Sequence, residues 1–204
     1  MALFSYKTGV WPISLEIAGA RLSLNQDGSV QLQVGATEIG QGADTVFSQM
    51  AAETLHMDIS RVHIVTQQDT DVTPFDTGAY ASRQSFVTGT AVKECAQQLK
   101  QKILEYARTL VPGNVDRLEL EDGYILADGK PVISLEDLAM ESYYSLSNSS
   151  VLTAEVSRQV KKNTVASGCC FAEVEVDMKL GKIKVLDIVN VHDSGVLLNP
   201  QLAA

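Results

Sequence analysis

The sequence predicts an α+β fold in which mixed β-sheets carry helices packed on one face. Short runs of alternating apolar residues flank turn dipeptides, which is typical of paired strands. Apolar residues at helical spacing fill two longer segments. Strands and helices do not follow one another in a regular strand–helix–strand order, so an α+β arrangement is favoured over a parallel α/β sheet.

The first predicted unit is a β-hairpin. Apolar residues alternate from Leu15 to Leu24 and again over 30–34, and Asp27-Gly28 lies between the two runs. An Asp-Gly pair readily adopts the positive φ angles of a tight turn, so the two runs predict antiparallel strands.

Two helices are predicted in the first half of the chain. One covers about 44–56, and a short strand over 60–65 and a polar loop over 66–77 follow it. The longer helix covers about 82–110 and ends before Pro112-Gly113. Its apolar stripe consists of Val87, Ala91, Cys95, Leu99, Ile103 and Ala107.

The second half predicts a hairpin over 118–126, a helix over 134–143 capped by Ser134, and a loop over 145–150. Two long strands follow, at about 167–178 and 182–192. We expect two possible sub-units, about 1–112 and 113–204.

Composition excludes several classes of function. The 16 basic and 25 acidic residues give a formal charge of −9, which disfavours a nucleic-acid partner. No apolar stretch approaches the roughly 18 residues of a membrane span, and the N-terminus lacks a signal-peptide pattern. We therefore expect a cytoplasmic protein without membrane or nucleic-acid partners.

Metal ligation by the protein itself is not expected. The three cysteines include the adjacent pair Cys169 and Cys170 and show no CxxC spacing, so zinc or iron–sulfur ligation is disfavoured. We expect this pair to lie in a strand, with one side chain facing the core and the other facing away. The three histidines are far apart and suggest no metal site or catalytic triad.

The first candidate site segment is Gly35-Ala36-Thr37-Glu38-Ile39-Gly40-Gln41-Gly42, between a predicted strand and a predicted helix. Its three glycines let the backbone approach a ligand closely, and the N–H groups of the following helix attract anionic oxygens. The spacing differs from the GxGxxG dinucleotide motif. The alternative is a simple strand-to-helix connection. In either case Glu38, the only acidic residue of the segment, is expected to make a local hydrogen bond and not to act as a base.

The second candidate segment, 78–85, precedes the long helix. Arg83 can fork onto a phosphate or another planar acceptor, and Ser82 can cap the helix. The alternative is that Ser82 is only a cap and Arg83 is solvated. Two anion-attracting helix starts, at 42 and 82, would suit one ligand with a phosphate and many heteroatoms.

Three segments together resemble the large subunits of molybdenum hydroxylases, the xanthine dehydrogenase and aldehyde oxidase family. They are GATEIGQG, TPFDTGAYASRQSFVTGTAV (73–92) and FAEVEVDMKLGKIKVLDIVNVHDSGVLLNP (171–200), in the order and near the spacing of that family. The phrases ISLEIAGARL and QDTDVTPFDTGAYASRQ are most similar to the bacterial xanthine dehydrogenases.

The resemblance implies that residues 1–204 are part of a molybdopterin-binding region. It places Ala81 beside the molybdenum as a small residue and not as a ligand. The residues it assigns to the molybdopterin cofactor are Gly40, Gln41, Gly42, Ala81, Ser82, Arg83, Gln84 and Ser85.

For the intact protein, the resemblance implies an oxidoreductase of purine-metabolism type that hydroxylates a heterocycle or an aldehyde with oxygen from water. Its partners would be the remaining domains of the large subunit and iron–sulfur and FAD subunits or domains. The family's glutamate base belongs to a later segment, so no catalytic residue is assigned here.

We therefore expect a catalytically inactive portion that lacks cofactor when isolated and exposes apolar surface where sister domains pack. The alternative is a free-standing cofactor-binding or assembly module. A nucleotide-binding domain would need a phosphate-loop lysine at one of the helix starts, and neither start has one.

Overall fold

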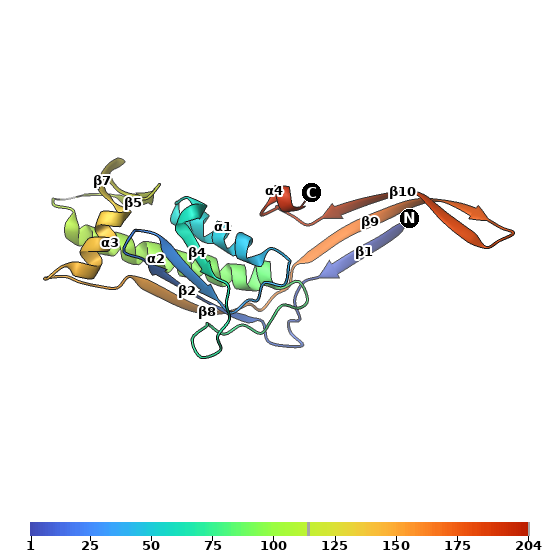
Figure 1. Cartoon of the computed structure of the whole chain (residues 1–204), viewed down its shortest axis with the longest axis horizontal. Coiled ribbons are helices and arrows are strands. Elements are labelled where there is room, and N and C mark those ends of the chain that lie inside the picture. Colours follow the sequence, from blue (N-terminus) through green and yellow to red (C-terminus); the bar gives the residue numbers. More distant parts are fainter. Residues whose placement is uncertain (114, 204) are drawn as a thin grey trace.

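The computed structural model describes residues 1–113 and 115–203, which form an elongated molecule with a helix-covered body and a long β-arm (Figure 1). The helices are α1 (Ala43–Leu55), α2 (Gln84–Leu110), α3 (Leu135–Tyr144) and the short α4 (Pro200–Ala203). Within the described residues there is no helix long and apolar enough to cross a membrane.

Three sheets organise the strands, and in two of them all pairs are antiparallel. The body sheet has the order β4 (Val62–Val65), β3 (Val30–Val34), β2 (Ile17–Leu24), β8 (Thr153–Gln159), and only its β3–β4 pair is parallel. The arm sheet has the order β1 (Ala2–Lys7), β9 (Val165–Asp177), β10 (Lys182–Asp193). The small sheet consists of β5 (Leu118–Glu121), β6 (Tyr124–Ala127) and β7 (Lys130–Ser134).

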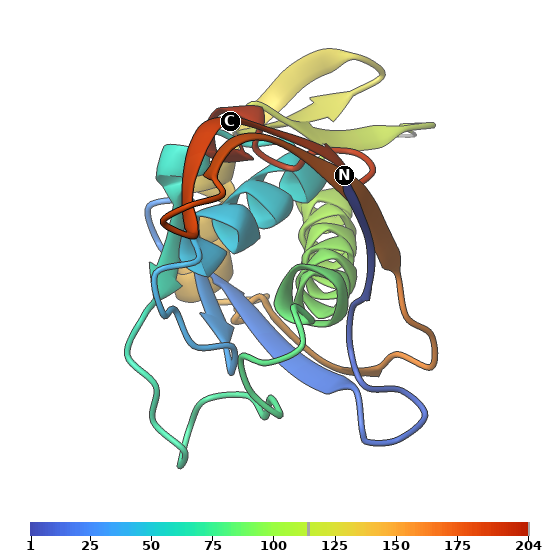
Figure 2. The same ribbon diagram turned by 90° about the vertical axis from the view of Figure 1, so that its right-hand side faces the viewer.

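The body buries its core between the four-stranded sheet and helices α1 and α2, which lie on the same side of it (Figure 2). The whole predicted stripe of α2 is buried, and Leu22 of β2 faces Leu32 of β3 across the predicted hairpin. The predicted fold class, the hairpin and both helices are confirmed, because each depends on local periodicity.

Three strands and one connection differ from the prediction. β1, β7 and β8 were not predicted, and the predicted strand over 60–65 begins with a 3-10 turn at Ile59–Arg61. The pairs β2–β8 and β1–β9 join residues on opposite sides of position 112. The two predicted sub-units therefore share both larger sheets.

The arm is exposed along most of its length. Every residue of β10 is exposed, including Ile188 and Val191, and β9 exposes Phe171, Val174 and Val176. This confirms the expected exposed apolar surface. Cys169 and Cys170 do lie in a strand, but both are only half-buried, so the expectation that one of them faces a core is wrong.

Candidate functional site

The two candidate segments meet at one cavity of about 430 Å³. It lies between the start of α1, the start of α2 and the end of β1, from which Tyr6 reaches in. All the predicted site residues except Gly40 line it: Gln41, Gly42, Ala81, Ser82, Arg83, Gln84 and Ser85. The fold thus brings together segments separated by some 40 positions, as the hypothesis of one shared ligand requires.

An amide bridge joins the two loops. Gln41 Nε2 donates to Gln84 Oε1 at 2.5 Å, and both side-chain amides donate to the Thr37 carbonyl at 3.1 Å. The Gln41 oxygen accepts a bond from the Ile39 N–H at 2.7 Å. The amides therefore hold a fixed orientation at the cavity wall.

The start of α1 already has an internal anion. The Glu38 carboxylate accepts bonds from the N–H groups of Gly40 (2.6 Å), Gly42 (3.1 Å) and Asp44 (3.1 Å). The bond from Asp44, followed by those from the two glycines, lowers the pKa of Glu38 below its ordinary value. The expected local role of Glu38 is confirmed, and the N–H groups of Gly42 and Asp44 at this helix start are already paired with its carboxylate.

The start of α2 has an unusual backbone. Ala81 and Ser82 have φ angles of 49° and 51°, in the left-handed region, which costs on the order of 1 kcal/mol or more for each residue. The helix begins at Gln84, and Arg83 is its N-cap residue without a side-chain cap bond. Ser82 lies two residues before the start of the helix and has a left-handed backbone, so the prediction that it caps the helix is wrong.

Arg83 is fully buried, contrary to the solvated alternative. Its planar acceptors are carboxylates of the chain itself: Nε binds Glu16 and Nη1 binds Asp76, each at 2.5 Å. Burial lowers the pKa of the Arg83 guanidinium, but the bond to Glu16 and the charge of Asp76 outweigh it and raise the pKa above its ordinary value. The guanidinium is thus engaged and is not free to bind a phosphate.

Two glycines allow the loop before α2 to lie directly on the body sheet. A side chain at Gly35 would collide with the Pro74 carbonyl, and the Gly19 N–H donates to the Phe75 carbonyl at 2.8 Å. The first glycine of the GATEIGQG segment therefore serves close packing of the loop. Gly40 and Gly42, with φ of 98° and 82°, provide the turn beside the cavity.

The cavity is suited to an anionic, heteroatom-rich ligand. None of the described residues that line it is acidic, although the chain as a whole carries a charge of −9. The first N–H groups of α2, at Gln84 and Ser85, have no intrahelical acceptor, and Ser82 and Ser85 add exposed hydroxyls. Such donors fit a phosphate, and the two amides fit a pterin ring.

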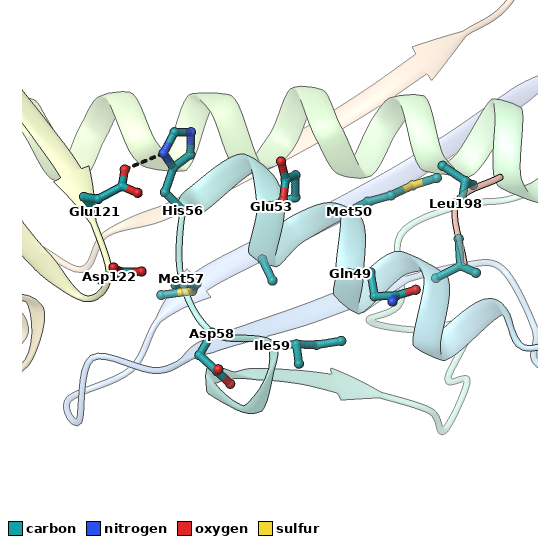
Figure 3. Close-up of a pocket in the computed structure, with 12 residues that line it drawn as sticks. Gln49, Met50, Glu53, His56, Met57, Asp58, Ile59, Glu121, Asp122 and Leu198 are labelled. Atoms are coloured by element: carbon teal, nitrogen blue, oxygen red, sulfur yellow. Dashed lines mark hydrogen bonds and ion pairs between the residues drawn. The ribbon is translucent and has the colours of Figure 1, made fainter. Parts of the chain in front are cut away.

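A larger cavity of about 860 Å³ has the opposite character (Figure 3). His56 Nδ1 lies 2.6 Å from Glu121, and Glu53, Asp58 and Asp122 also line this cavity. Its carboxylates disfavour a phosphate-bearing ligand. Within the part of the chain that the structure describes, no group of three or more His, Cys, Asp or Glu side chains could hold a metal ion.

Sequence reasoning missed part of the site. Tyr6 comes from a strand that was not predicted, and nothing local links it to the two loops. Glu16 and Asp76 hold Arg83 from 67 and 7 residues away. A buried arginine needs carboxylate partners, so its burial could have prompted a search for them, but the burial itself had no local signal.

Known proteins share this fold and sequence. The xanthine dehydrogenase molybdenum-binding subunit of Escherichia coli O157:H7 is 48% identical over 206 residues, which cover all of this chain and 27% of that protein. The chain thus spans about a quarter of the length of this curated relative.

Solved structures agree at the level of the fold. CO dehydrogenase from Oligotropha carboxidovorans superposes with a TM-score of 0.83 at 23% identity, over 98% of this chain and 26% of that one. Quinoline 2-oxidoreductase from Pseudomonas putida 86 gives 0.76 at 22% identity, over 98% and 27%. The family model described as molybdopterin cofactor-binding domain matches residues 1–204, and the chain therefore belongs to that family.

Proposed function

We propose that the 430 Å³ cavity holds the pterin and phosphate of molybdopterin in the intact protein. The observation that carries this proposal is the convergence of both loops on one cavity that has hydrogen-bond donors and no lining carboxylate. The membership of the chain in the cofactor-binding family supports the choice of ligand.

Seven of the eight predicted residues have a task in this proposal. The remaining N–H of the Gln84 amide and the oxygens of Gln41 and Gln84 bind the heteroatoms of the pterin, while Gly40 and Gly42 keep the adjacent backbone free of side chains. Ser82, Ser85 and the first N–H groups of α2 bind the phosphate. Ala81 leaves space beside the metal. The Arg83 guanidinium is left out of the ligand contacts, because Glu16 and Asp76 bind it.

The chemistry belongs to the cofactor. When bound, molybdenum supplies the transfer of oxygen from water to carbon and accepts two electrons. This chain binds and orients the cofactor and limits water around it. No residue of the cavity is proposed as a general base: none of the described lining residues is acidic, and Glu38 is held by backbone N–H groups.

We further propose that the intact protein is a cytoplasmic xanthine dehydrogenase-like oxidoreductase acting on a heterocycle of the purine class or an aldehyde. The 48% identity to a xanthine dehydrogenase subunit supports this proposal. The remaining large-subunit domains, and iron–sulfur and FAD subunits or domains, would be its partners. The exposed apolar surface of the arm is the observation that favours such partner domains. We expect the isolated chain to be inactive.

Binding of extracted molybdopterin to the intact protein, with each substitution made in that protein, tests the proposed site. We expect Ala81→Phe, which fills the cavity, to lower pterin binding at least tenfold, or about 1.4 kcal/mol, while Ser147→Ala, on an exposed loop, leaves it unchanged. Equal binding by Ala81→Phe would contradict the site. Tight stoichiometric binding by the isolated chain would favour the free-standing module, and turnover of xanthine or an aldehyde would contradict its inactivity.

A further inference from the structure

Arg83 is the centre of a buried cluster whose hydrogen-bonding groups are almost all satisfied. Its guanidinium donates to Glu16, Asp76, the Gly78 carbonyl (3.0 Å) and the Ile17 carbonyl (2.7 Å). The side chains of Arg83, Glu16 and Asp76 are at most 1% exposed. Burying these charges costs desolvation energy, so the cluster is weak evidence of a contribution to stability.

The carboxylates are fully engaged by further donors. Asp76 accepts bonds from the Gly78 N–H and from the Thr88 hydroxyl, both at 2.8 Å. The second oxygen of Glu16 accepts the Val10 N–H at 2.5 Å. The cluster therefore ties the start of β2, the loop before α2 and the first turns of α2 to one another.

The loop that the cluster holds is the strained one. The Ala81 carbonyl accepts a bond from the Gly9 N–H at 2.7 Å, and the Tyr80 ring lies 5.5 Å from the guanidinium carbon of Arg83. Ala81 and Ser82, in left-handed conformation, sit between these contacts. A strained backbone persists only where its surroundings over-determine it, and here the Arg83 cluster provides that constraint.

The charge of the cluster argues against direct attraction of an anion. One guanidinium faces two carboxylates, so the buried group carries no positive excess toward the cavity. An arginine that attracts a phosphate by its charge needs a positive charge that its own chain does not compensate. The charge of Arg83 is compensated by two carboxylates.

We infer that Arg83 is a positioning residue: through Glu16 and Asp76 it fixes the Ala81–Ser82 turn in the geometry that receives the cofactor, and it does not itself bind the phosphate. This inference rests on the proposed function for the identity of the ligand. The effect of Arg83 on the Ala81–Ser82 turn does not depend on the identity of the ligand and concerns this chain alone.

The test combines hydrogen–deuterium exchange in this chain with pterin binding in the intact protein. Lysine at position 83 keeps the charge but offers a point donor in place of the planar fork. We expect Arg83→Lys to exchange at least about tenfold faster over 76–86 than the wild type, with 92–106 of α2 unchanged. Pterin binding should fall with it.

A second variant covers the case in which Arg83→Lys does not fold. Thr88→Val removes one hydroxyl bond to Asp76 and keeps the ion pairs, so we expect a several-fold increase in exchange over 76–86. Arg158→Lys is the matched control, because Arg158 pairs with Glu94 at the exposed surface, at 3.6 Å. We expect this substitution to leave exchange over 76–86 unchanged.

Unchanged exchange over 76–86 in a folded Arg83→Lys, or in Thr88→Val where the lysine variant does not fold, would overturn the inference. Wild-type pterin binding by Arg83→Lys would also overturn it, because charge alone would then suffice. Failure of the intact wild-type protein to bind pterin in this cavity would instead count against the proposed function, and the exchange result would still decide whether Arg83 positions the turn.

Discussion

The body and the arm of this chain use the same strand-forming residues in opposite ways. In β2 the apolar side chains are buried against α2, and Leu22 and Leu24 are fully inaccessible. In β10 the apolar side chains lie on both faces of the strand, and Ile188 and Val189 are each at least half exposed. The body completes its own core, whereas the arm carries apolar surface that a globular protein normally covers.

This difference explains how the cavity is built. Both loops belong to the body, which completes its own core. Among the described residues that line the cavity, only Tyr6 of β1 comes from the arm sheet. The ligand-facing geometry is therefore fixed by the packed core and the Arg83 cluster, while the arm is available to other domains.

The largest expected effect tests the body. Phe47 of α1 is fully buried, so Phe47→Ala removes a large side chain from the core. We expect a loss of about 3–5 kcal/mol in the free energy of unfolding, measured by urea denaturation. A loss below about 1 kcal/mol would mean that α1 does not pack as described.

A smaller effect is expected where the loop lies on the sheet. Gly35→Ala puts a methyl group against the Pro74 carbonyl, so the loop must shift. We expect a loss of about 1–3 kcal/mol in the free energy of unfolding and a lower affinity for pterin. Gly129→Ala is a matched control for added bulk, because Gly129 has open space around it, although its positive φ carries its own cost.

Acid titration tests the capping carboxylate. The folded pKa of Glu38 lies below the ordinary value of 4.5, so its stabilisation is fully present above the unfolded pKa and is lost as pH falls through the folded pKa. We expect Glu38→Gln to be less stable than the wild type at pH 7, with the gap closing below pH 4.5. A gap independent of pH would show that the Glu38 charge contributes nothing.

The smallest effect is expected in the arm. Ile188→Ala truncates a side chain that is 53% exposed, so we expect a change below about 0.5 kcal/mol in the free energy of unfolding. The same substitution should weaken association with the partner domains proposed above. A loss as large as that of Phe47→Ala would contradict the description of the arm as uncovered.

The sequence predicted those parts of the fold that depend on neighbouring residues. The β2–β3 hairpin and the buried stripe of α2 follow from alternation and helical spacing. β1 and β8 were missed because their partners lie far along the chain: Ala2 pairs with Cys170, and Thr153 with Ser23. Every residue of β1 is also exposed, so this strand has no buried face within the chain.

The sequence selected the two loops that line the cavity, but not the contacts that shape them. Motif resemblance selected both loops, and the fold places them at one cavity. The burial of Arg83 was not predictable, because Glu16 precedes it by 67 residues and is brought to it only by the packing of the loop on β2. A local hydrogen bond of Glu38 was predicted. The sequence did not show that its carboxylate accepts bonds from three N–H groups around the start of α1.

An experimental structure of the intact protein with bound molybdopterin tests the proposed site most directly. We expect pterin density beside Gln41 and Gln84 and the phosphate at the start of α2, near Ser82 and Ser85, with Arg83 still bound to its two carboxylates. Density in the acidic cavity beside His56 and Glu121, or a phosphate bonded to the Arg83 guanidinium, would contradict it.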